Sequence, residues 1–359
     1  MSNFKNFFTK ITNKIKSLYK NSSNIIGIDL GTANTLICTP EKGIILNEAS
    51  TISYITENGI NSGYLYGTKA KELIGKTPFK IEVINPVDDG VVSYSNLTED
   101  MVRKFLSTVI KENMLFQPII ICGVPFSATD VEKKALQEIL ERCNAKEALL
   151  VYESIASAVG ANLQIDKPIG SLIIDIGGGT TEISVISLGG IIKNRTFKYG
   201  GRKIDKSIIE FIEHKYKLLI GENTAEEIKK QISCVYLKQD EEPKKMLIHG
   251  RNLKTNVPQE IVIDQNDLVY ALAEFTNILV DNLNQILQST QPELMKDIIK
   301  NGVTICGGGA KIGNLDYVIE KTTGLKSTIP NNPELCLING LQKIISNYKQ
   351  YNYLLFKQI

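Results

Sequence analysis

The spacing of apolar and polar positions predicts a chain of short strands and amphipathic helices. Over residues 4–19, apolar residues recur at three- and four-residue intervals, as on one face of a helix, and lysines fill most of the other face. Residues 21–24 are polar and predict a linker. Beyond them, short apolar runs between turn residues indicate strands, and longer periodic segments indicate helices.

The predicted elements follow one order, β-β-β-α-β-α-β-α, in two successive parts of the chain. The first part is expected to contain strands over 24–28, 35–39 and 43–46, a small inserted subdomain over 54–86, a helix over 98–111, a buried strand over 118–124, a helix to about residue 143 that a capping box opens at Thr129, a strand over 148–152 and a helix over 153–163. The second part is expected to contain strands over 172–176, 182–187 and 191–197, helices over 204–218 and 224–235, weak strands over 241–263, one long helix over 264–288, a strand over 302–306 and a helix over 338–348. The repeated order predicts two α/β domains, each with a mixed sheet and its own insertion.

Two segments of this pattern are built alike. Residues 26–35 form an apolar run that contains Asp29 and leads into a Gly/Thr-rich turn, and residues 173–182 repeat that arrangement around Asp175, 146 positions later. Internal duplication of this kind predicts two similar half-molecules that face each other across a cleft. A single glycine turn of this type would more often be an ordinary hairpin.

The duplicated turns have the chemistry of a nucleotide site. Glycine-rich turns after a strand let backbone N–H groups approach phosphate oxygens, because no side chain blocks them. Asp29 and Asp175 end their strands, and two facing carboxylates suit a hydrated Mg²⁺ ion that bridges phosphates. A third glycine cluster, at residues 307–310, also follows a predicted strand and is expected to pack against adenine or an α-phosphate.

Composition excludes several other kinds of protein. The net charge of +2 gives no basic field for nucleic acid, and the two histidines stand in no motif, which argues against histidine acid–base chemistry. The six cysteines form no CxxC pair, so we expect neither a zinc site nor a disulfide framework, and a reduced cytoplasmic setting fits best. No apolar run is long enough to cross a bilayer, and the N-terminal lysines interrupt any signal peptide.

With these three turns in order, the chain resembles the actin-like ATPases, and among them the MreB family of bacterial actins, from about residue 24 to residue 348. The resemblance rests on residues 27–35, 123–125 with 129–132, 175–181, 307–310 and 339–340. It implies the actin-like, ribonuclease H-like fold: a duplicated two-domain α/β molecule with a central nucleotide cleft and two inserted subdomains. The boundaries that it implies are 1–23 for a membrane helix and linker, 24–53, 87–167 and 334–359 for subdomain IA, 54–86 for IB, 168–203 and 268–333 for IIA, and 204–267 for IIB.

The resemblance also implies roles for individual residues around Mg²⁺ and ATP or ADP. Glu153 and Thr180 match the family's catalytic glutamate and its partner in ordering the attacking water. Asp29, Asp175 and Asp205 match aspartates near the metal, which they would hold through water. The nucleotide contacts that it implies are Gly31, Thr32, Ala33, Asn34, Gly177, Gly178, Gly179, Glu226, Glu227, Lys229, Gly307, Gly308, Gly309, Ala310 and Lys311.

Phosphoryl transfer to water depends mainly on positioning and on charge neutralisation, so these residues are consistent with a slow ATPase that times an assembly. The family usually has proline directly after the catalytic glutamate, whereas this chain has Ser154. The replacement frees one backbone N–H and is expected to loosen the start of the helix that carries Glu153.

The N-terminal helix suits the surface of an anionic bilayer. Its apolar face consists mainly of Phe4, Phe7, Phe8, Ile11 and Ile15, and the segment carries five lysines and no acid. The alternative is a helix docked on the protein itself. Family members often pair such a helix with an apolar loop, which Leu115 and Phe116 match here, and residues 351–357 are either a third membrane contact or part of the chain's own domain.

Three functions remain open from the sequence. The first is a filament protein of the cell-shape cytoskeleton, cytoplasmic and peripheral on the inner face of the membrane, with itself and other actin-like or cell-envelope proteins as partners and no nucleic acid. The second is a sugar or acetate kinase of the same superfamily, for which we find no acceptor motif. The third is a chaperone ATPase or a non-polymerising regulator; a chaperone would need a long peptide-binding domain after the ATPase core.

Overall fold

The structure is a computed structural model that describes residues 25–57, 60–110 and 117–358. The helix predicted over residues 4–19 and the loop with Leu115 and Phe116 lie outside the described residues. Among the described residues, no helix combines the length and the apolar character needed to cross a bilayer.

The molecule contains two five-stranded mixed sheets with the same strand order. The first sheet has the order β10-β9-β1-β2-β3, formed by β10 (Glu147–Tyr152), β9 (Ile119–Val124), β1 (Ile25–Leu30), β2 (Asn34–Thr39) and β3 (Gly43–Ala49). The second has the order β18-β17-β11-β12-β13, formed by β18 (Ser327–Thr328), β17 (Val303–Cys306), β11 (Ser171–Ile176), β12 (Thr181–Ser187) and β13 (Gly190–Phe197). The predicted duplication is therefore a duplication of sheet topology.

The register is duplicated as well. In the first hairpin Asp29 lies opposite Leu36, and in the second Asp175 lies opposite Glu182, so each aspartate faces the residue seven positions later. In each sheet the central strand also has a parallel neighbour: β1 pairs with β9, and β11 pairs with β17. The two aspartates thus occupy equivalent places in their half-molecules.

Each half carries an inserted small sheet and a set of covering helices. The insertion of the first half contains β4 (Ile52–Glu57), β5 (Ile60–Tyr66), α2 (Thr68–Lys71) and β6 (Ile81–Ile84), and a short hairpin of β7 (Val87–Asp88) and β8 (Val91–Val92) follows it. The insertion of the second half contains β14 (Leu218–Leu219), α7 (Glu222–Ile232), β15 (Lys245–Asn252) and β16 (Pro258–Asp264). The remaining helices are α3 (Ser95–Val109), α4 (Asp130–Arg142), α5 (Glu153–Gly160), α6 (Gly201–Tyr216), α8 (Gln265–Ala271), α9 (Ala273–Ser289), α10 (Pro292–Asn301), α11 (Leu315–Thr323), α12 (Cys336–Ser346) and α13 (Tyr348–Tyr351).

Most predicted elements are present, with boundaries that differ by a few residues. The capping box at Thr129 is confirmed, because its hydroxyl accepts from the Glu132 N–H and the Glu132 carboxylate accepts from the Thr129 N–H. The single helix predicted over 264–288 is wrong: it divides into α8 and α9 at Leu272, whose ψ of 4° departs from helical geometry. Helices α10 and α11 were not predicted.

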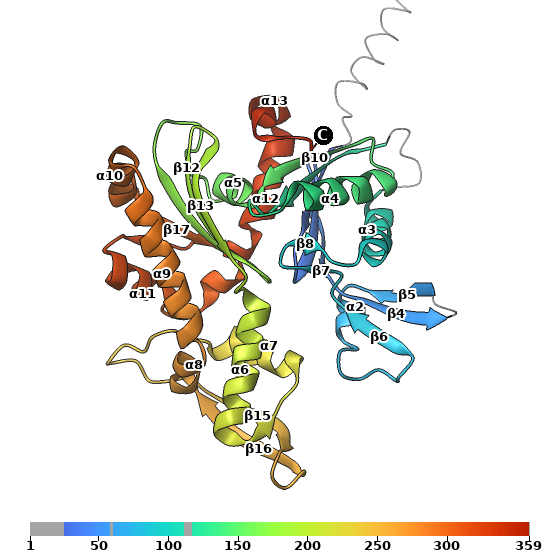
Figure 1. Cartoon of the computed structure of the whole chain (residues 1–359), viewed down its shortest axis with the longest axis vertical. Coiled ribbons are helices and arrows are strands. Elements are labelled where there is room, and N and C mark those ends of the chain that lie inside the picture. Colours follow the sequence, from blue (N-terminus) through green and yellow to red (C-terminus); the bar gives the residue numbers. More distant parts are fainter. Residues whose placement is uncertain (1–24, 58–59, 111–116, 359) are drawn as a thin grey trace, which may run out of the picture.

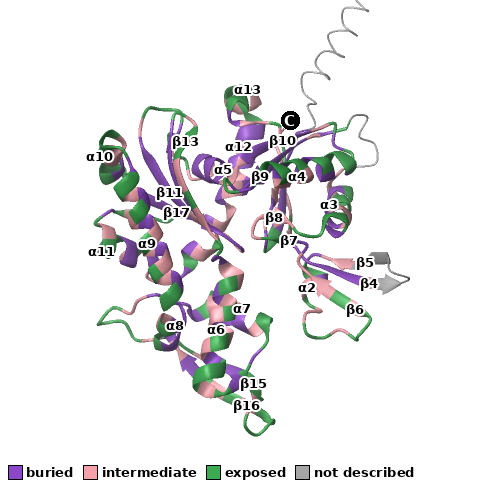
Figure 2. Cartoon of the chain, viewed as in Figure 1, coloured by how far each residue is buried: buried purple, intermediate pink, exposed green. Residues whose placement is uncertain are grey.

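The described core has a main apolar cluster in each half, a third cluster between the halves, and a small fourth one around Ile52, Tyr54 and Leu97. The third joins strand residues of both sheets, such as Ile121 and Ile173, to α5 and α12, which lie between the sheets in Figure 1. Figure 2 shows the same arrangement as buried strands and helix faces turned inward, with exposed outer faces on α4 and α10.

Helices α5 and α12 cross at two glycines. A methyl group added to Gly160 would lie 1.8 Å from the Cys336 carbonyl oxygen, and one added to Gly340 would lie 1.8 Å from that of Ala156. The contact is reciprocal, because each glycine follows by four residues the carbonyl that the other glycine touches. No side chain larger than glycine fits at this crossing.

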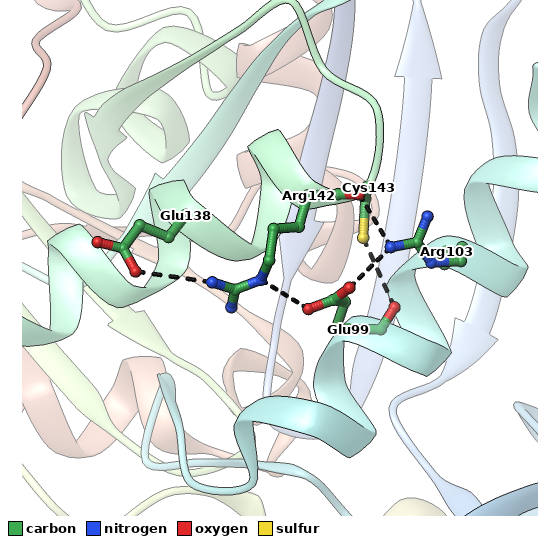
Figure 3. Close-up of polar contacts among 5 residues, drawn as sticks. All are labelled: Glu99, Arg103, Glu138, Arg142 and Cys143. Carbon is green, nitrogen blue, oxygen red and sulfur yellow. Dashed lines mark hydrogen bonds and ion pairs between the residues drawn. The ribbon is translucent and has the colours of Figure 1, made fainter.

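A charged cluster fixes α3 against the end of α4 (Figure 3). The Glu99 carboxylate pairs with Arg103 and Arg142, each at 2.7 Å, and Arg142 also pairs with Glu138 at 3.7 Å. The Cys143 thiol donates to the Glu99 carbonyl. The two arginines lower the pKa of Glu99 against a desolvation that raises it.

Residues 353–358, which we call the C-terminal strap, pack on the chain's own domain. Phe356 forms a two-hydrogen-bond antiparallel bridge with Leu150 on the edge strand β10. Leu354 is buried in the cluster between the halves. The sequence left two alternatives for residues 351–357, a membrane contact or packing on the chain's own domain, and in the structure they pack on the domain.

Candidate functional site

The two duplicated hairpins meet turn against turn. The same hydrogen bond closes both turns, from the Gly31 N–H to the Asn34 carbonyl at 3.1 Å and from the Gly177 N–H to the Thr180 carbonyl at 2.9 Å. A methyl group added to Gly178 would lie 2.8 Å from Ala33 Cβ. The approach of the two backbones at this point therefore requires glycine.

A third backbone segment borders the hairpins. The β7–β8 turn places Gly90 so that its N–H donates to the Thr32 hydroxyl at 2.9 Å. A methyl group on Gly179 would lie 2.7 Å from the Asp89 Cα, so this turn also touches the second hairpin. Asp88 pairs with Arg202 at the start of α6, which adds a charged contact between the halves.

Helix α6 begins directly on the second hairpin. The N–H groups of Gly201 and Arg202 donate to the carbonyls of Gly177 and Gly178, at 2.9 and 2.8 Å. These bonds use the first free N–H groups of the helix and hold the glycine turn in one conformation. The carbonyls of Gly177 and Gly178 therefore point to α6, and the N–H groups of Gly178 and Gly179, unlike that of Gly177, remain for a ligand.

Three predicted carboxylates gather behind the hairpins. Burial, reinforced by the charge of Asp175, raises the pKa of Asp29 to about 7. Burial also raises the pKa of Asp175 to about 6, although the Ser157 hydroxyl, which donates to this carboxylate at 2.5 Å, lowers it. The pKa of Glu153 lies well above its usual range, because the group is buried and because Glu182, Asp29 and Asp175 repel its charge. The structure thus brings Asp29, Asp175 and Glu153 together.

Glu182 is a fourth carboxylate here that the sequence analysis did not single out. Its side chain is 2% exposed, and it accepts hydrogen bonds from the Ser154 hydroxyl at 2.6 Å and the Phe126 N–H at 2.8 Å. Burial raises its pKa, while these donors lower it. The signal that could have found it is an acid in β12, a strand whose residues are otherwise apolar or hydroxylic and all buried.

Ser154 also departs from the expectation drawn for it. Rather than leave the start of α5 loose, its fully buried hydroxyl donates to Glu182 and accepts from the Ser184 hydroxyl at 2.9 Å. Helix α5 belongs to the first half and β12 to the second, so this hydrogen-bond chain ties the halves together beside Glu153.

Asp205 lies in a second polar group, with Lys229 and Glu226. The Lys229 ammonium bonds to Asp205 at 2.8 Å and to the Gly201 carbonyl at 2.9 Å, and a methyl group on Gly201 would lie 3.2 Å from it. Glu226 pairs with Lys71 of the first half at 2.6 Å. Burial raises the pKa of Asp205 to about 6 even with Lys229 beside it, and one oxygen of this carboxylate is buried without a partner.

The other residues for which the resemblance implies nucleotide contacts lie in two places, on α7 and at the third glycine turn. Glu227 is exposed and accepts from Gln231, on another face of α7 than its neighbour Glu226. At the third turn, a methyl group on Gly307 would lie 2.5 Å from an Asp175 carboxylate oxygen, whereas Gly308 is open to solvent. Gly309 packs on Ile176, Ala310 is buried, and Lys311 pairs with Glu334 at 2.6 Å.

The carboxylates fit a hydrated divalent cation. Asp29 and Asp175 are acceptor groups whose raised pKa values reflect buried negative charge, which a cation would stabilise. Within the described ranges, no three His, Cys, Asp or Glu side chains form a metal-binding group. A Mg²⁺ ion held through water by Asp29 and Asp175 would take its other ligands from phosphate and water, as it commonly does.

Comparisons with known proteins agree with this geometry. The family model described as MreB/Mbl protein matches residues 23–353. The cell shape-determining protein MreB of Haemophilus influenzae is 36% identical over 330 residues, 91% of this chain and 93% of the relative. The cell shape-determining protein Mbl of Bacillus subtilis is 36% identical over 322 residues, 90% of this chain and 96% of the relative. The crystal structure of MreB5 of Spiroplasma citri bound to AMPPNP aligns with a TM-score of 0.86 at 32% identity, over 92% of this chain and 98% of that one.

Proposed function

The chain belongs to the MreB/Mbl family and has the actin-like fold, and on that premise we propose that it is a bacterial actin that binds ATP and assembles into membrane-associated filaments that determine cell shape. The curated relatives are named cell shape-determining proteins. The subdomain boundaries implied by the family resemblance are part of the proposal.

One observation carries the nucleotide site. The hairpins around Asp29 and Asp175 share sequence, register and turn hydrogen bond, and they face each other at Gly178 and Ala33. Backbone N–H groups from both turns would hold the phosphates of ATP or ADP from opposite sides. Because the turns touch in this structure, a triphosphate between them requires the halves to part slightly. The AMPPNP bound to the similar MreB5 supports the proposal.

The adenosine end of the nucleotide belongs on the second half. Glu226 and Lys229 are half-buried on the side of α7 that faces α6, where they can reach a ribose, and the third turn follows β17 beside Asp175. Glu226 would then exchange part of its pairing with Lys71 for a ribose hydroxyl. Glu227, which is exposed, contributes least.

Hydrolysis is assigned to Glu153 with Thr180. Mg²⁺, held through water by Asp29 and Asp175, would neutralise charge on the phosphates. The Glu153 carboxylate would orient the attacking water, and the raised pKa of this buried group makes it a stronger proton acceptor when it is ionised. Asp205 is paired with Lys229, and no contact places it with the other two aspartates, so its metal role is the least supported by geometry.

The membrane part of the proposal rests on sequence. The lysine-rich apolar segment that contains Phe4, Phe7, Phe8, Ile11 and Ile15, and the loop with Leu115 and Phe116, would bind anionic lipid on the inner face of the cell membrane. Assembly with copies of itself, in stacked protofilaments that can pair, is proposed from the family.

Electron microscopy of the purified chain with ATP on anionic lipid monolayers tests the proposal. Ordered filaments on lipid are expected, and isolated particles that still bind ATP would favour a non-polymerising regulator. Asp175→Ala should abolish calorimetric AMPPNP binding, whereas Glu153→Ala should keep binding and slow phosphate release. Tight binding by Asp175→Ala would overturn the site, and ADP production that needs a sugar or acetate would favour a kinase.

A further inference from the structure

The C-terminal strap crosses from one half of the molecule to the other. Its Phe356 N–H donates to the Leu150 carbonyl at 3.0 Å and its carbonyl accepts from the Leu150 N–H at 2.8 Å. The Gln358 N–H donates to the side chain of Gln137 on α4 at 2.8 Å. A methyl group on Gly189, in the β12–β13 turn, would lie 2.5 Å from the Tyr353 ring. The strap therefore touches β10 and α4 of the first half and β12–β13 of the second.

The strap also completes a row of three aromatic rings. The Phe356 ring lies 4.8 Å from that of Tyr152, and the Tyr152 ring lies 4.9 Å from that of Phe126. Tilted rings at these centroid distances attract each other beyond their buried area. Tyr152 is thus held between a residue of the strap and a residue of the loop that precedes α4.

Two carboxylates of the site, Glu153 and Glu182, are connected to this row through the backbone. Tyr152 is the residue before Glu153 and the N-cap of α5, and it has no side-chain cap hydrogen bond. The N–H of Phe126 donates to Glu182 at 2.8 Å. Since the N-cap provides no side-chain hydrogen bond, packing of Tyr152 acts together with the Ser154–Glu182 hydrogen bond to fix the direction in which α5 starts.

We propose that Phe356 is a positioning residue: the docked strap fixes Tyr152 and Phe126, and through them Glu153 and Glu182, in the geometry that hydrolysis needs. The proposal deepens the ATPase assignment and rests on it. When the strap undocks, β10 regains a free edge, and Tyr152 loses one of its two aromatic neighbours. Glu153 then samples more orientations, while the phosphate-binding turns, which do not touch the strap, keep theirs.

Variants of Phe356 separate positioning from general stability. Phe356→Ala should slow single-turnover phosphate release about tenfold, the scale expected when a catalytic group is displaced by less than about 1 Å, with AMPPNP affinity unchanged. Phe356→Tyr, which keeps the ring, should restore the rate. Lys357→Ala is the matched control, because it removes the strap's ion pair with Glu141 and leaves the row intact. Equal rates for Phe356→Ala and wild type, or a loss of affinity that parallels the loss of rate, would overturn the proposal.

A measurement without hydrolysis distinguishes this proposal from the ATPase assignment. Hydrogen exchange of the nucleotide-free chain should become faster at the first turn of α5 in Phe356→Ala, and stay unchanged in α6. The chain has no tryptophan, so Phe356→Trp also gives a single indole whose emission reports docking of the strap. If exchange at α5 is the same in Phe356→Ala and wild type, the positioning role is refuted whatever the ATPase rate. If exchange at α5 is faster in Phe356→Ala but the wild-type chain does not hydrolyse ATP, the packing role is supported and the ATPase assignment is refuted instead.

Discussion

Replacing Asp29 by asparagine should stabilise the nucleotide-free protein. The pKa of Asp29 rises from 3.8 in the unfolded chain to about 7 in the folded one. The folded chain therefore binds the proton more tightly, and stability falls as the pH rises from about 4 through about 7. At 1.36 kcal/mol per pKa unit, the raised pKa lowers the free energy of unfolding by about 4 kcal/mol at pH 8, where the buried group is ionised, and by about 1.5 kcal/mol at pH 5, where folding must first protonate it. The neutral amide of the variant would carry neither cost.

Thermal unfolding at two pH values measures this difference. For 359 residues, about 4 kcal/mol corresponds to a rise of about 5 °C in the melting temperature of Asp29→Asn at pH 8, and the smaller cost to a rise of about 2 °C at pH 5. Exposed Asp240 supplies the control, since Asp240→Asn should shift the melting temperature little at either pH. With Mg²⁺ and AMPPNP the order should reverse, because only wild type gains the metal. A variant that is no more stable than wild type at pH 8, or whose gain is independent of pH, would refute the buried-charge reasoning.

Three further predictions address other parts of the molecule. Gly178→Ala should weaken AMPPNP binding about tenfold, because its methyl group would occupy the space between the two turns that the phosphates are proposed to enter. Gly190→Ala, whose methyl group would meet its nearest neighbour only at 3.7 Å, is the calorimetric control, and equal affinities of Gly178→Ala and wild type would contradict the close contact. Removal of residues 1–20 should abolish flotation with anionic vesicles and preserve AMPPNP binding, so a shortened chain that still floats would exclude the N-terminal anchor. Glu99→Gln should lower the melting temperature by about 1 °C in low salt and by less in high salt, since ion pairs near the surface are weak and screened. If scanning calorimetry shows the same fall in melting temperature at both salt concentrations, the ion pairs in Figure 3 do not account for it.

The hairpins and their aspartates could be predicted because the information is local. An apolar run, an aspartate and a glycine turn within ten residues specify a strand, its end and its turn, and the second copy around Asp175 supplies the pairing of the halves. Glu153 and Thr180 followed with the help of the family resemblance, and the structure places Glu153 beside both aspartates.

Long-range partners could not be read in the same way. Glu182 is held by Ser154 and the Phe126 N–H, which lie 28 and 56 positions away in the sequence, so no window of neighbouring residues contains the site. The prediction of one long helix across Leu272 failed for a similar reason: the apolar period continues through the break, and only backbone geometry reveals it. The ion pair of Lys71 with Glu226 depends on how two insertions meet across the molecule.

The reciprocal glycine crossing of α5 and α12 makes these two helices one rigid unit of the first half. Sliding either helix along the other would drive a carbonyl into the neighbouring backbone at Gly160 or Gly340. Helix α5 begins at Glu153, and α12 packs on β1, the strand that carries Asp29. The crossing therefore keeps the proposed catalytic glutamate at a fixed spacing from the proposed metal aspartate, whatever the second half does.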